Sequence, residues 1–144
     1  MTDRFHYVTY IRTTPEKLFE ALTTPEFNRQ FWMGNHQVSD WKVGSPWRIE
    51  AADGKVWDTG EVLEYDPPRR YAVSWTHQVR PELMAEGASR ATFELEPMGE
   101  VVKLIVTHEI DNGPNFIAAV SGGWPMILSN LKTLLETGET LPAS

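Results

Sequence analysis

Four histidines are the residues of this 144-residue chain with the most scope for acid–base or metal chemistry. His6, His36, His77 and His108 occur singly, and no pair has the H-x-H or H-x-x-x-H spacing that places two imidazoles on one ion. The chain has no cysteine, which excludes disulfides, zinc–thiolate sites and thiol catalysis. It also lacks a G-x-S-x-G nucleophile elbow and the glycine-rich loops that bind phosphates or dinucleotides. We therefore expect no metal and no cofactor, and any histidine here would act by hydrogen bonding or as a general acid or base.

Two of these histidines are predicted to face the interior of a sheet. Three runs alternate apolar and polar residues with period two, as strands with one buried face do: 71–79, 90–96 and 101–110. The simplest hairpin register places His77 beside Ala91, and the next hairpin places Ala91 beside Val106 or His108. The two imidazoles would then lie roughly 10 Å apart with a small side chain between them, too far to share a metal ion. They could instead bind the polar ends of one small ligand.

A ligand cavity between this sheet and a C-terminal helix is the hypothesis that follows. Its predicted lining residues are Trp75, His77, Ala91, Phe93, Val106, His108, Trp124 and Leu128. A plain structural interpretation stays open for several of them. Each histidine could be solvated at the rim or bonded to a backbone carbonyl, and Trp124 and Leu128 could be ordinary helix–sheet core. Trp32 could belong to the core or to the mouth of the pocket.

The elements before the sheet are predicted from capping signals and alternation. Residues 5–12 are rich in aromatic and β-branched side chains and predict a strand. The tetrapeptide TTPE then occurs twice and predicts two short helices, 15–22 and 25–33, because Thr can cap a helix, Pro suits its first position and Glu suits its first turn. Gly34 ends the second helix, and 36–110 is predicted to be an antiparallel meander.

The last element is predicted to be a long helix, about 123–137, ended by Gly138. Its apolar stripe has the spacing of one buried helical face: Ile127, Leu128, Leu131, Leu134 and Leu135. Because Pro125 has no amide hydrogen, the helix either begins near Trp124 or is kinked there after an earlier turn at 115–121. The 80–88 loop carries two apolar residues, so it is either a lid over the cavity mouth or a contact with a neighbouring subunit.

Composition limits the class of protein. The length fits a single domain over 1–144. The chain has 13 Lys and Arg against 20 Asp and Glu, a net charge of −7, which is the wrong sign for binding nucleic acid through its phosphates. No apolar run approaches the length of a membrane span, and the charged first residues do not resemble a signal peptide. We expect a cytoplasmic protein that binds neither nucleic acid nor the membrane interior.

Three segments stand out in chain order: TTPEKLFEALTTPEFNRQFWMG, LEYDPPRRYAVSW and GGWPMILSNLKTLLETG. Together they resemble the family of homologues of the activator of the heat-shock protein 90 ATPase, which belongs to the START-like, or SRPBCC, superfamily. The resemblance spans nearly the whole chain. It implies an α+β helix-grip fold, in which a curved antiparallel sheet wraps around a long C-terminal helix and two short helices follow the first strand.

The resemblance implies less about function, because one fold carries many functions. Our leading hypothesis is a protein that binds a hydrophobic small molecule, either apolar or aromatic, in the cavity. One alternative is an enzyme of the cyclase or hydratase type with His77 or His108 as general acid or base. Another is a cochaperone-like interaction domain. That role would lack the separate N-terminal domain through which the eukaryotic cochaperone engages its chaperone, because this chain starts at the first strand.

Overall fold

The computed structural model describes residues 1–142 as seven strands and four helices. In chain order these are β1 (Thr2–Ile11), α1 (Pro15–Thr23), α2 (Pro25–Phe31), β2 (His36–Ser39), β3 (Pro46–Glu50), β4 (Val56–Asp66), β5 (Arg70–His77), α3 (Pro81–Met84), β6 (Ser89–Met98), β7 (Val101–Asp111) and α4 (Pro114–Thr137). The predicted order of elements is therefore confirmed. The first strand begins three residues earlier than predicted, and α2 ends two residues earlier.

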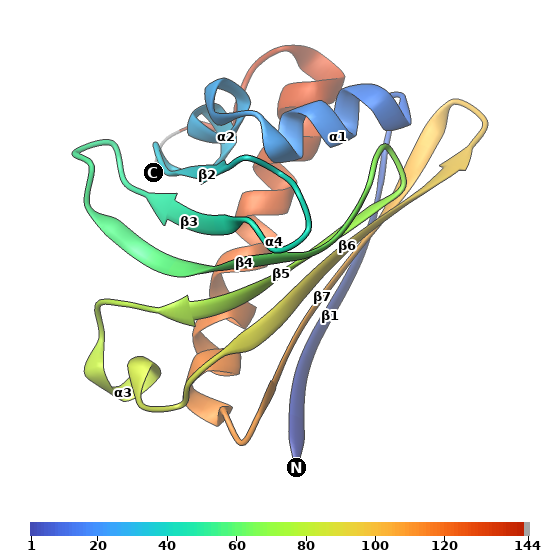
Figure 1. The fold of residues 1–144 in the computed structure, drawn as a ribbon. Helices are drawn as coiled ribbons and strands as arrows, with labels where there is room; N and C mark the ends of the chain where they lie inside the picture. Colours follow the sequence, from blue (N-terminus) through green and yellow to red (C-terminus); the bar gives the residue numbers. More distant parts are fainter. Residues whose placement is uncertain (143–144) are drawn as a thin grey trace.

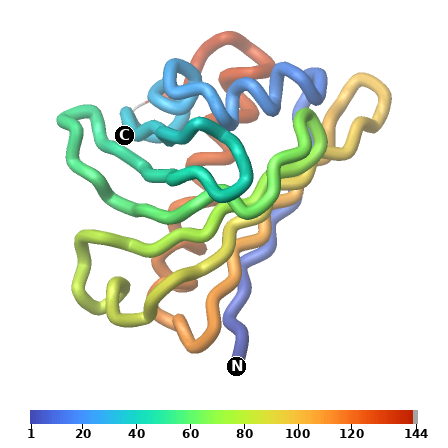
Figure 2. The backbone as a smooth tube through the Cα atoms, in the orientation of Figure 1, coloured from blue at the N-terminus to red at the C-terminus, as the bar shows by residue number. Residues whose placement is uncertain are grey.

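The strands form one antiparallel sheet in the order β1-β7-β6-β5-β4-β3-β2. The sheet curves, α4 runs across its concave side, and α1 and α2 cover one end (Figure 1). The backbone tube shows the same arrangement, with the first and the seventh strand side by side although they are far apart in sequence (Figure 2). This is the predicted α+β helix-grip fold.

The capping chemistry explains where the short helices begin. Thr14 caps α1, because its side chain accepts a hydrogen bond from the amide of Lys17 at 3.2 Å, and Pro15 occupies the first helical position. Thr24 precedes α2 without a side-chain cap bond, so Pro25 is the stronger start signal there. Gly34 follows with a φ of 81°, a backbone conformation that favours glycine.

Helix α4 is longer than the sequence suggested. It begins at Pro114 and continues through Pro125, so the predicted start near residue 123 is wrong. The alternative, a helix that continues from an earlier turn at 115–121, is closer to the structure. Pro125 removes one backbone hydrogen bond. The helix segments before and after the proline are both anchored in the core, because Phe116 of the first and Ile127 of the second are buried there. Gly138, with a φ of 84°, ends the helix as predicted.

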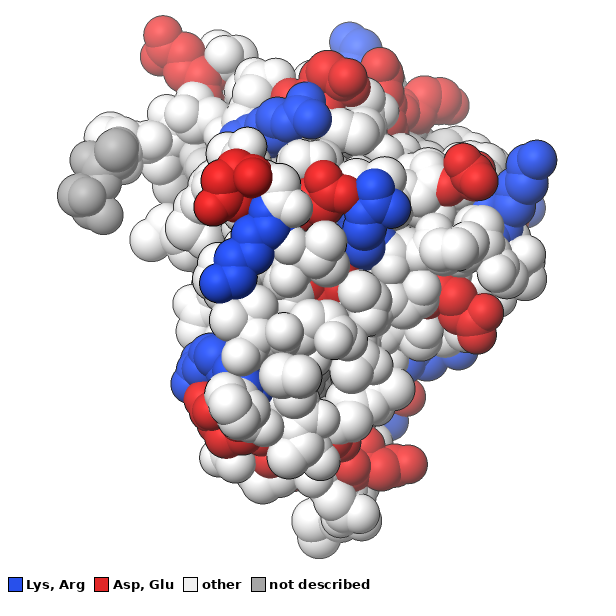
Figure 3. Space-filling model, turned by 60° about the vertical axis from the view of Figure 1, so that its left-hand side comes forward, with Lys and Arg blue, Asp and Glu red and all other residues white. Residues whose placement is uncertain are grey.

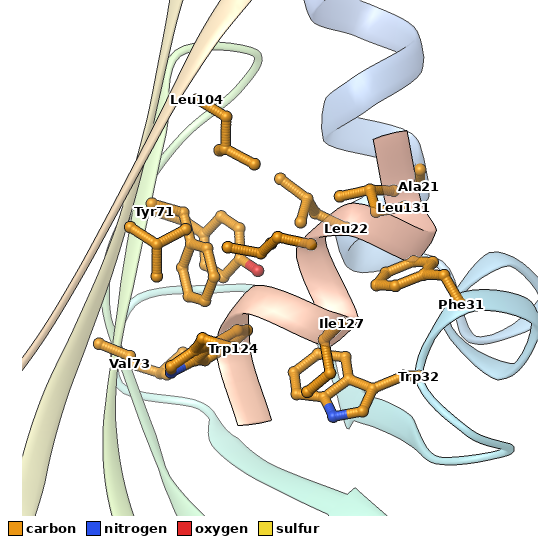
Figure 4. Packing of buried hydrophobic residues seen from close by; sticks show 14 of the residues in the cluster. Ala21, Leu22, Phe31, Trp32, Tyr71, Val73, Leu104, Trp124, Ile127 and Leu131 are labelled. Carbon is orange, nitrogen blue, oxygen red and sulfur yellow. The ribbon is translucent and has the colours of Figure 1, made fainter. Parts of the chain in front are cut away.

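The core lies between the sheet and the helices. Every second residue of β7 faces it, as the alternation predicted: Val102, Leu104, Val106, His108 and Ile110 are all buried. Figure 4 shows how side chains from the sheet, such as Tyr71 and Val73, and from the short helices, such as Leu22 and Phe31, meet around α4. The helix thus forms the centre of the packing.

The surface mixes charges of both signs. On the face shown in Figure 3, Lys and Arg side chains are interspersed with Asp and Glu side chains over a largely uncharged background. No helix within residues 1–142 combines the length and the apolarity needed to cross a lipid bilayer.

Candidate functional site

A cavity of about 420 Å³ lies between the concave side of the sheet and the first half of α4. Its floor and walls come from three parts of the fold: α4, through Ala119, Val120 and Gly123, the residues just after α2, and strands β3, β4 and β5. Exposed Met33 and exposed Arg80 stand at its edge. The space is therefore an apolar pocket with a mouth on the surface.

Indole rings make up much of the pocket wall. Trp75 on β5 has ring-centroid distances of 5.8 Å to Trp124 of α4 and 6.3 Å to Trp32, while Trp32 and Trp124 are 5.3 Å apart. Trp32 is only 5% exposed, so it belongs to both the core and the pocket wall. Such flat, rigid side chains suit an aromatic ligand, because they offer large apolar area with little loss of side-chain entropy.

One side of the pocket wall is polar. Asp58 and His77 are directly opposite each other on β4 and β5, so their side chains share a face of the sheet. The Nδ1 atom of His77 lies 2.9 Å from Oδ1 of Asp58, and both residues are more than nine-tenths buried. Burial raises the pKa of Asp58, while hydrogen bonds from His77 and Trp75 act in the opposite direction. The carboxylate fixes the orientation of the imidazole.

The 80–88 loop closes another side. Leu83 of α3 is 4% exposed and lines the pocket, whereas its neighbour Met84 faces outward. Glu86 ties the loop to α4, since its carboxylate accepts hydrogen bonds from the amides of Asn115 at 3.1 Å and Phe116 at 2.7 Å. The loop is thus attached to the helix that forms the pocket floor.

His108 lies in the core with both ring nitrogens occupied. The indole N–H of Trp124 donates to its Nδ1 at 3.1 Å, so the ring proton resides on Nε2 and is donated to Oγ of Ser89 at 2.9 Å. The hydroxyl of Ser89 in turn donates to the carbonyl of Trp75 at 2.8 Å. Burial lowers the pKa of His108 to about 3, so the ring is neutral. We assign it a structural role.

The predicted site residues divide into two groups. Trp75, His77 and Trp124 line the pocket. The other five are buried without reaching its wall: Ala91, Phe93, Val106, His108 and Leu128. The predicted cavity and the observed one therefore share Trp75 and His77 on the sheet and Trp124 on α4.

The predicted register of the β5–β6 hairpin is wrong. Ser89 pairs with Trp75 and not with Val79, so Ala91 lies beside Val73, and His77 lies beyond the part of β5 that pairs with β6. The reason is the short helix α3, which lengthens the connection and ends the pairing earlier. Ala91 does lie beside His108, one of its two predicted neighbours. The two histidines consequently have separate surroundings, and the gap expected between them is absent from the described cavity.

Sequence reasoning missed Asp58 and Trp57 as pocket residues, whereas Leu83 lies on the 80–88 loop that was expected either to cover the cavity mouth or to contact a neighbouring subunit. Asp58 and Trp57 fall in the run 57–65, whose alternation is interrupted by a register shift between Val62 and Glu64. One signal was present: a carboxylate within a run of strand-forming residues, VWDTGEV, requires a partner when it is buried.

Comparison with known proteins places the chain in a family. A family model described as activator of Hsp90 ATPase homolog 1-like protein matches residues 12–136. None of the curated proteins searched matches the chain.

Solved structures share the fold. Protein MLL2253 from Mesorhizobium loti has a TM-score of 0.79 and 25% identity, over 92% of this chain and 96% of its own. CalU16 from Micromonospora echinospora has a TM-score of 0.77 and 19% identity, over 96% and 77%. The Aha1 dimer from Colwellia psychrerythraea has a TM-score of 0.71 and 24% identity, over 94% and 98%.

Proposed function

Because this chain belongs to the family of activator of Hsp90 ATPase homolog 1-like proteins, whose helix-grip fold it shares, we propose that it binds a small molecule between the sheet and α4. The ligand is apolar or aromatic and carries one polar group. The observation that carries the proposal is the pocket of about 420 Å³, with indole walls and a single buried polar pair, Asp58 and His77.

The size of the pocket argues against a packing defect. Protein interiors contain few voids larger than a water molecule, and each one costs stability. This chain keeps small residues, Ala119 and Gly123, where larger apolar side chains would fill the space. Apart from its chain neighbours and the backbone of its own helix, a Cβ atom added to Gly123 would meet no atom closer than Cδ1 of Ile127 at 4.0 Å. A glycine in a helix also costs about 1 kcal/mol relative to alanine, so its presence favours a role in keeping the pocket open.

An acid–base enzyme that uses the same pocket is the second candidate, and the orientation of His77 by Asp58 supports it. His108 does not suit this role, because both of its ring nitrogens are occupied and it is fully buried. If a bound compound is turned over, His77→Ala should lower kcat more than it weakens binding.

The test is to fill the pocket from α4. Gly123→Leu places a side chain in the cavity, whereas Gly122→Leu places the same side chain one residue away, at an exposed position outside the cavity lining. We expect biphenyl derivatives, titrated by NMR, to bind wild-type protein and Gly122→Leu, and to bind Gly123→Leu at least tenfold more weakly, while all three proteins remain folded. Equal binding by the two variants would show that the ligand lies elsewhere. A protein-interaction function on the outer surface would likewise be unaffected by Gly123→Leu.

A further inference from the structure

Met33 has a backbone conformation that methionine does not favour. Its φ is 53°, in the left-handed region that glycine adopts readily and that most other residues adopt only at a conformational cost. It directly follows Trp32, the C-cap of α2, and a left-handed residue at that position of a helix end is usually glycine. Local backbone chemistry therefore favours glycine at position 33, and the chain has a methionine there.

Two other non-glycine residues with positive φ in the described part of the chain have an evident reason for it. Asn112, with a φ of 54°, is of a type that tolerates this conformation. Trp41, with a φ of 56°, packs against the core, and its ring centroid lies 5.2 Å from that of Tyr71. Met33 has neither reason, since it is 69% exposed. Packing within the chain therefore does not compensate for its conformation.

Met33 lies at the mouth of the pocket. It lines the cavity together with Trp32, which belongs to the indole wall, and Asn35. The same cavity of about 420 Å³ extends to Trp124 and Gly123 of α4. An apolar side chain at such a mouth is removed from water when an apolar ligand fills the space beside it. Unfavourable backbone conformations are found preferentially at ligand sites, and this one occurs where a ligand would leave the cavity.

We infer that Met33 is a ligand-contact residue, which covers the outer end of an elongated ligand whose inner end contacts Trp75 and Trp124. The inference rests on the proposed function and specifies that the outer end of the ligand is aromatic or otherwise apolar. Methionine suits this contact, because its unbranched side chain adapts to different shapes and its sulfur packs favourably against aromatic rings. Arg80, the other exposed residue at the mouth, already forms an ion pair with Glu82 at 2.7 Å.

The experiment measures ligand affinity and stability in the same variant. Met33→Gly removes the side chain and the unfavourable conformation together, so it should bind ligand more weakly and yet unfold at the same urea concentration as wild-type protein or a higher one. We expect the dissociation constant of para-phenylphenol, measured by NMR titration, to rise about fivefold, the effect of losing part of one buried apolar side chain. The single ring of phenol can be held by the indoles alone, so its dissociation constant should stay within about twofold.

Two further variants make the result specific. Val43→Gly is the matched control, because Val43 is 68% exposed, precedes a glycine with positive φ as Met33 does, and lies outside the described cavity lining. The φ of Val43 itself is not positive, so Val43→Gly should not raise the stability, and both dissociation constants should stay unchanged. Met33→Leu keeps an apolar side chain of similar size and should retain most of the wild-type affinity.

Methionine methyl groups report the contact directly. In protein with isotope-labelled methionine methyl groups, saturating para-phenylphenol should shift the signal of Met33, which is assigned by its disappearance in Met33→Leu. Intermolecular nuclear Overhauser effects should connect this methyl group to the probe. The signals of Met98 and Met126, which are exposed and outside the described cavity lining, should stay in place.

The negative results have different meanings. If para-phenylphenol binds wild-type protein and Met33→Gly equally, or leaves the Met33 signal unshifted at saturation, Met33 does not contact the ligand, while the pocket remains a ligand site. If Met33→Gly binds weakly but is also less stable than Val43→Gly, Met33 has a structural role and the inference is overturned. If wild-type protein binds neither probe, the proposed function itself is contradicted, and the role of Met33 with it.

Discussion

His108 connects the sheet to α4 through hydrogen bonds inside the core. Its neutral ring accepts a hydrogen bond from the indole of Trp124 on α4 and donates one to Ser89 on β6. The hydroxyl of Ser89 in turn donates to a backbone carbonyl of β5. All the polar atoms in this chain of bonds are satisfied, which is the condition under which a buried polar network specifies a single packing arrangement. His108 thus positions Trp124, and Trp124 is a wall of the pocket.

Stability should depend on pH because of His108. Its pKa is about 3 in the folded protein against 6.5 ordinarily, so the unfolded chain takes up a proton below pH 6.5 while the folded chain does not. The contribution of neutral His108 to the free energy of unfolding is therefore fully present above pH 6.5 and is lost as the pH falls toward 3. We expect wild-type protein to lose about 1 kcal/mol per pH unit below pH 6.5, measured by urea unfolding.

The variant His108→Phe isolates this contribution. Glu64 and Glu136 have pKa values lowered by Arg70 and Lys132, so their contributions are lost only below their ordinary value of 4.5. Asp58, whose pKa is raised by burial, changes the stability in the opposite direction as the pH falls. His108→Phe should be less stable than wild-type at neutral pH, and the difference should narrow between pH 6.5 and about pH 5. A constant difference over this range would mean that His108 is not the buried neutral group described here.

Alternation along a strand predicted the burial of residues more accurately than it predicted their cross-strand neighbours. It placed His77, Phe93 and His108 in the interior, because burial depends only on the face of the strand. It could not find Asp58 as the partner of His77, because cross-strand neighbours depend on register and register depends on loop geometry. The polar side of the pocket was therefore hidden from the sequence.

Helix α4 begins with a capping group supplied by another segment. Gly113 at the N-cap has no side chain, and the carboxylate of Glu86 instead accepts hydrogen bonds from the first-turn amides of Asn115 and Phe116. A carboxylate at a helix N-terminus is favourable both as a hydrogen-bond acceptor and as a charge near the helix dipole. The same bonds hold the 80–88 loop, and with it Leu83, against the pocket.

Replacing Glu86 should therefore loosen the loop as well as the helix end. We expect Glu86→Ala to lower the free energy of unfolding by about 1 kcal/mol and to increase amide hydrogen exchange in residues 80–88 and in the first turn of α4. The matched control is Glu82→Ala on the same loop, where an exposed carboxylate forms an ion pair with exposed Arg80. Unchanged exchange in Glu86→Ala would contradict the anchoring role, and equal effects of the two substitutions would show that the loss of charge alone matters.

Some helix ends could be predicted from local sequence signals alone. The two TTPE segments and Gly138 marked helix ends, because capping and left-handed backbone conformations are local requirements. The start of α4 was misjudged because Pro125 suggested a boundary, whereas packing of Phe116 and Trp124 against the sheet keeps the helix continuous. Tertiary burial outweighed one missing hydrogen bond.

In the whole molecule, the curved sheet and α4 create the pocket together. The helix crosses the concave side of the sheet (Figure 1). Its second half packs tightly at Leu128 and Leu131, and its first half leaves space beside Ala119 and Gly123. The overall fold could be predicted from the order of elements and from the family resemblance. The position of the pocket could not, because it depends on where large and small side chains meet across the interface.

Intermolecular nuclear Overhauser effects between para-phenylphenol and the protein test the central proposal, ligand binding between the sheet and α4, most directly. If the pocket is the ligand site, cross-peaks will connect the aromatic protons of the probe to the indoles of Trp75 and Trp124 and to the methyl groups of Val120 and Ile127. These residues come from opposite walls of the same cavity. Cross-peaks confined to exposed residues on the outer face of the sheet, such as Val8 and Tyr10, would place the probe outside the cavity and contradict the proposal.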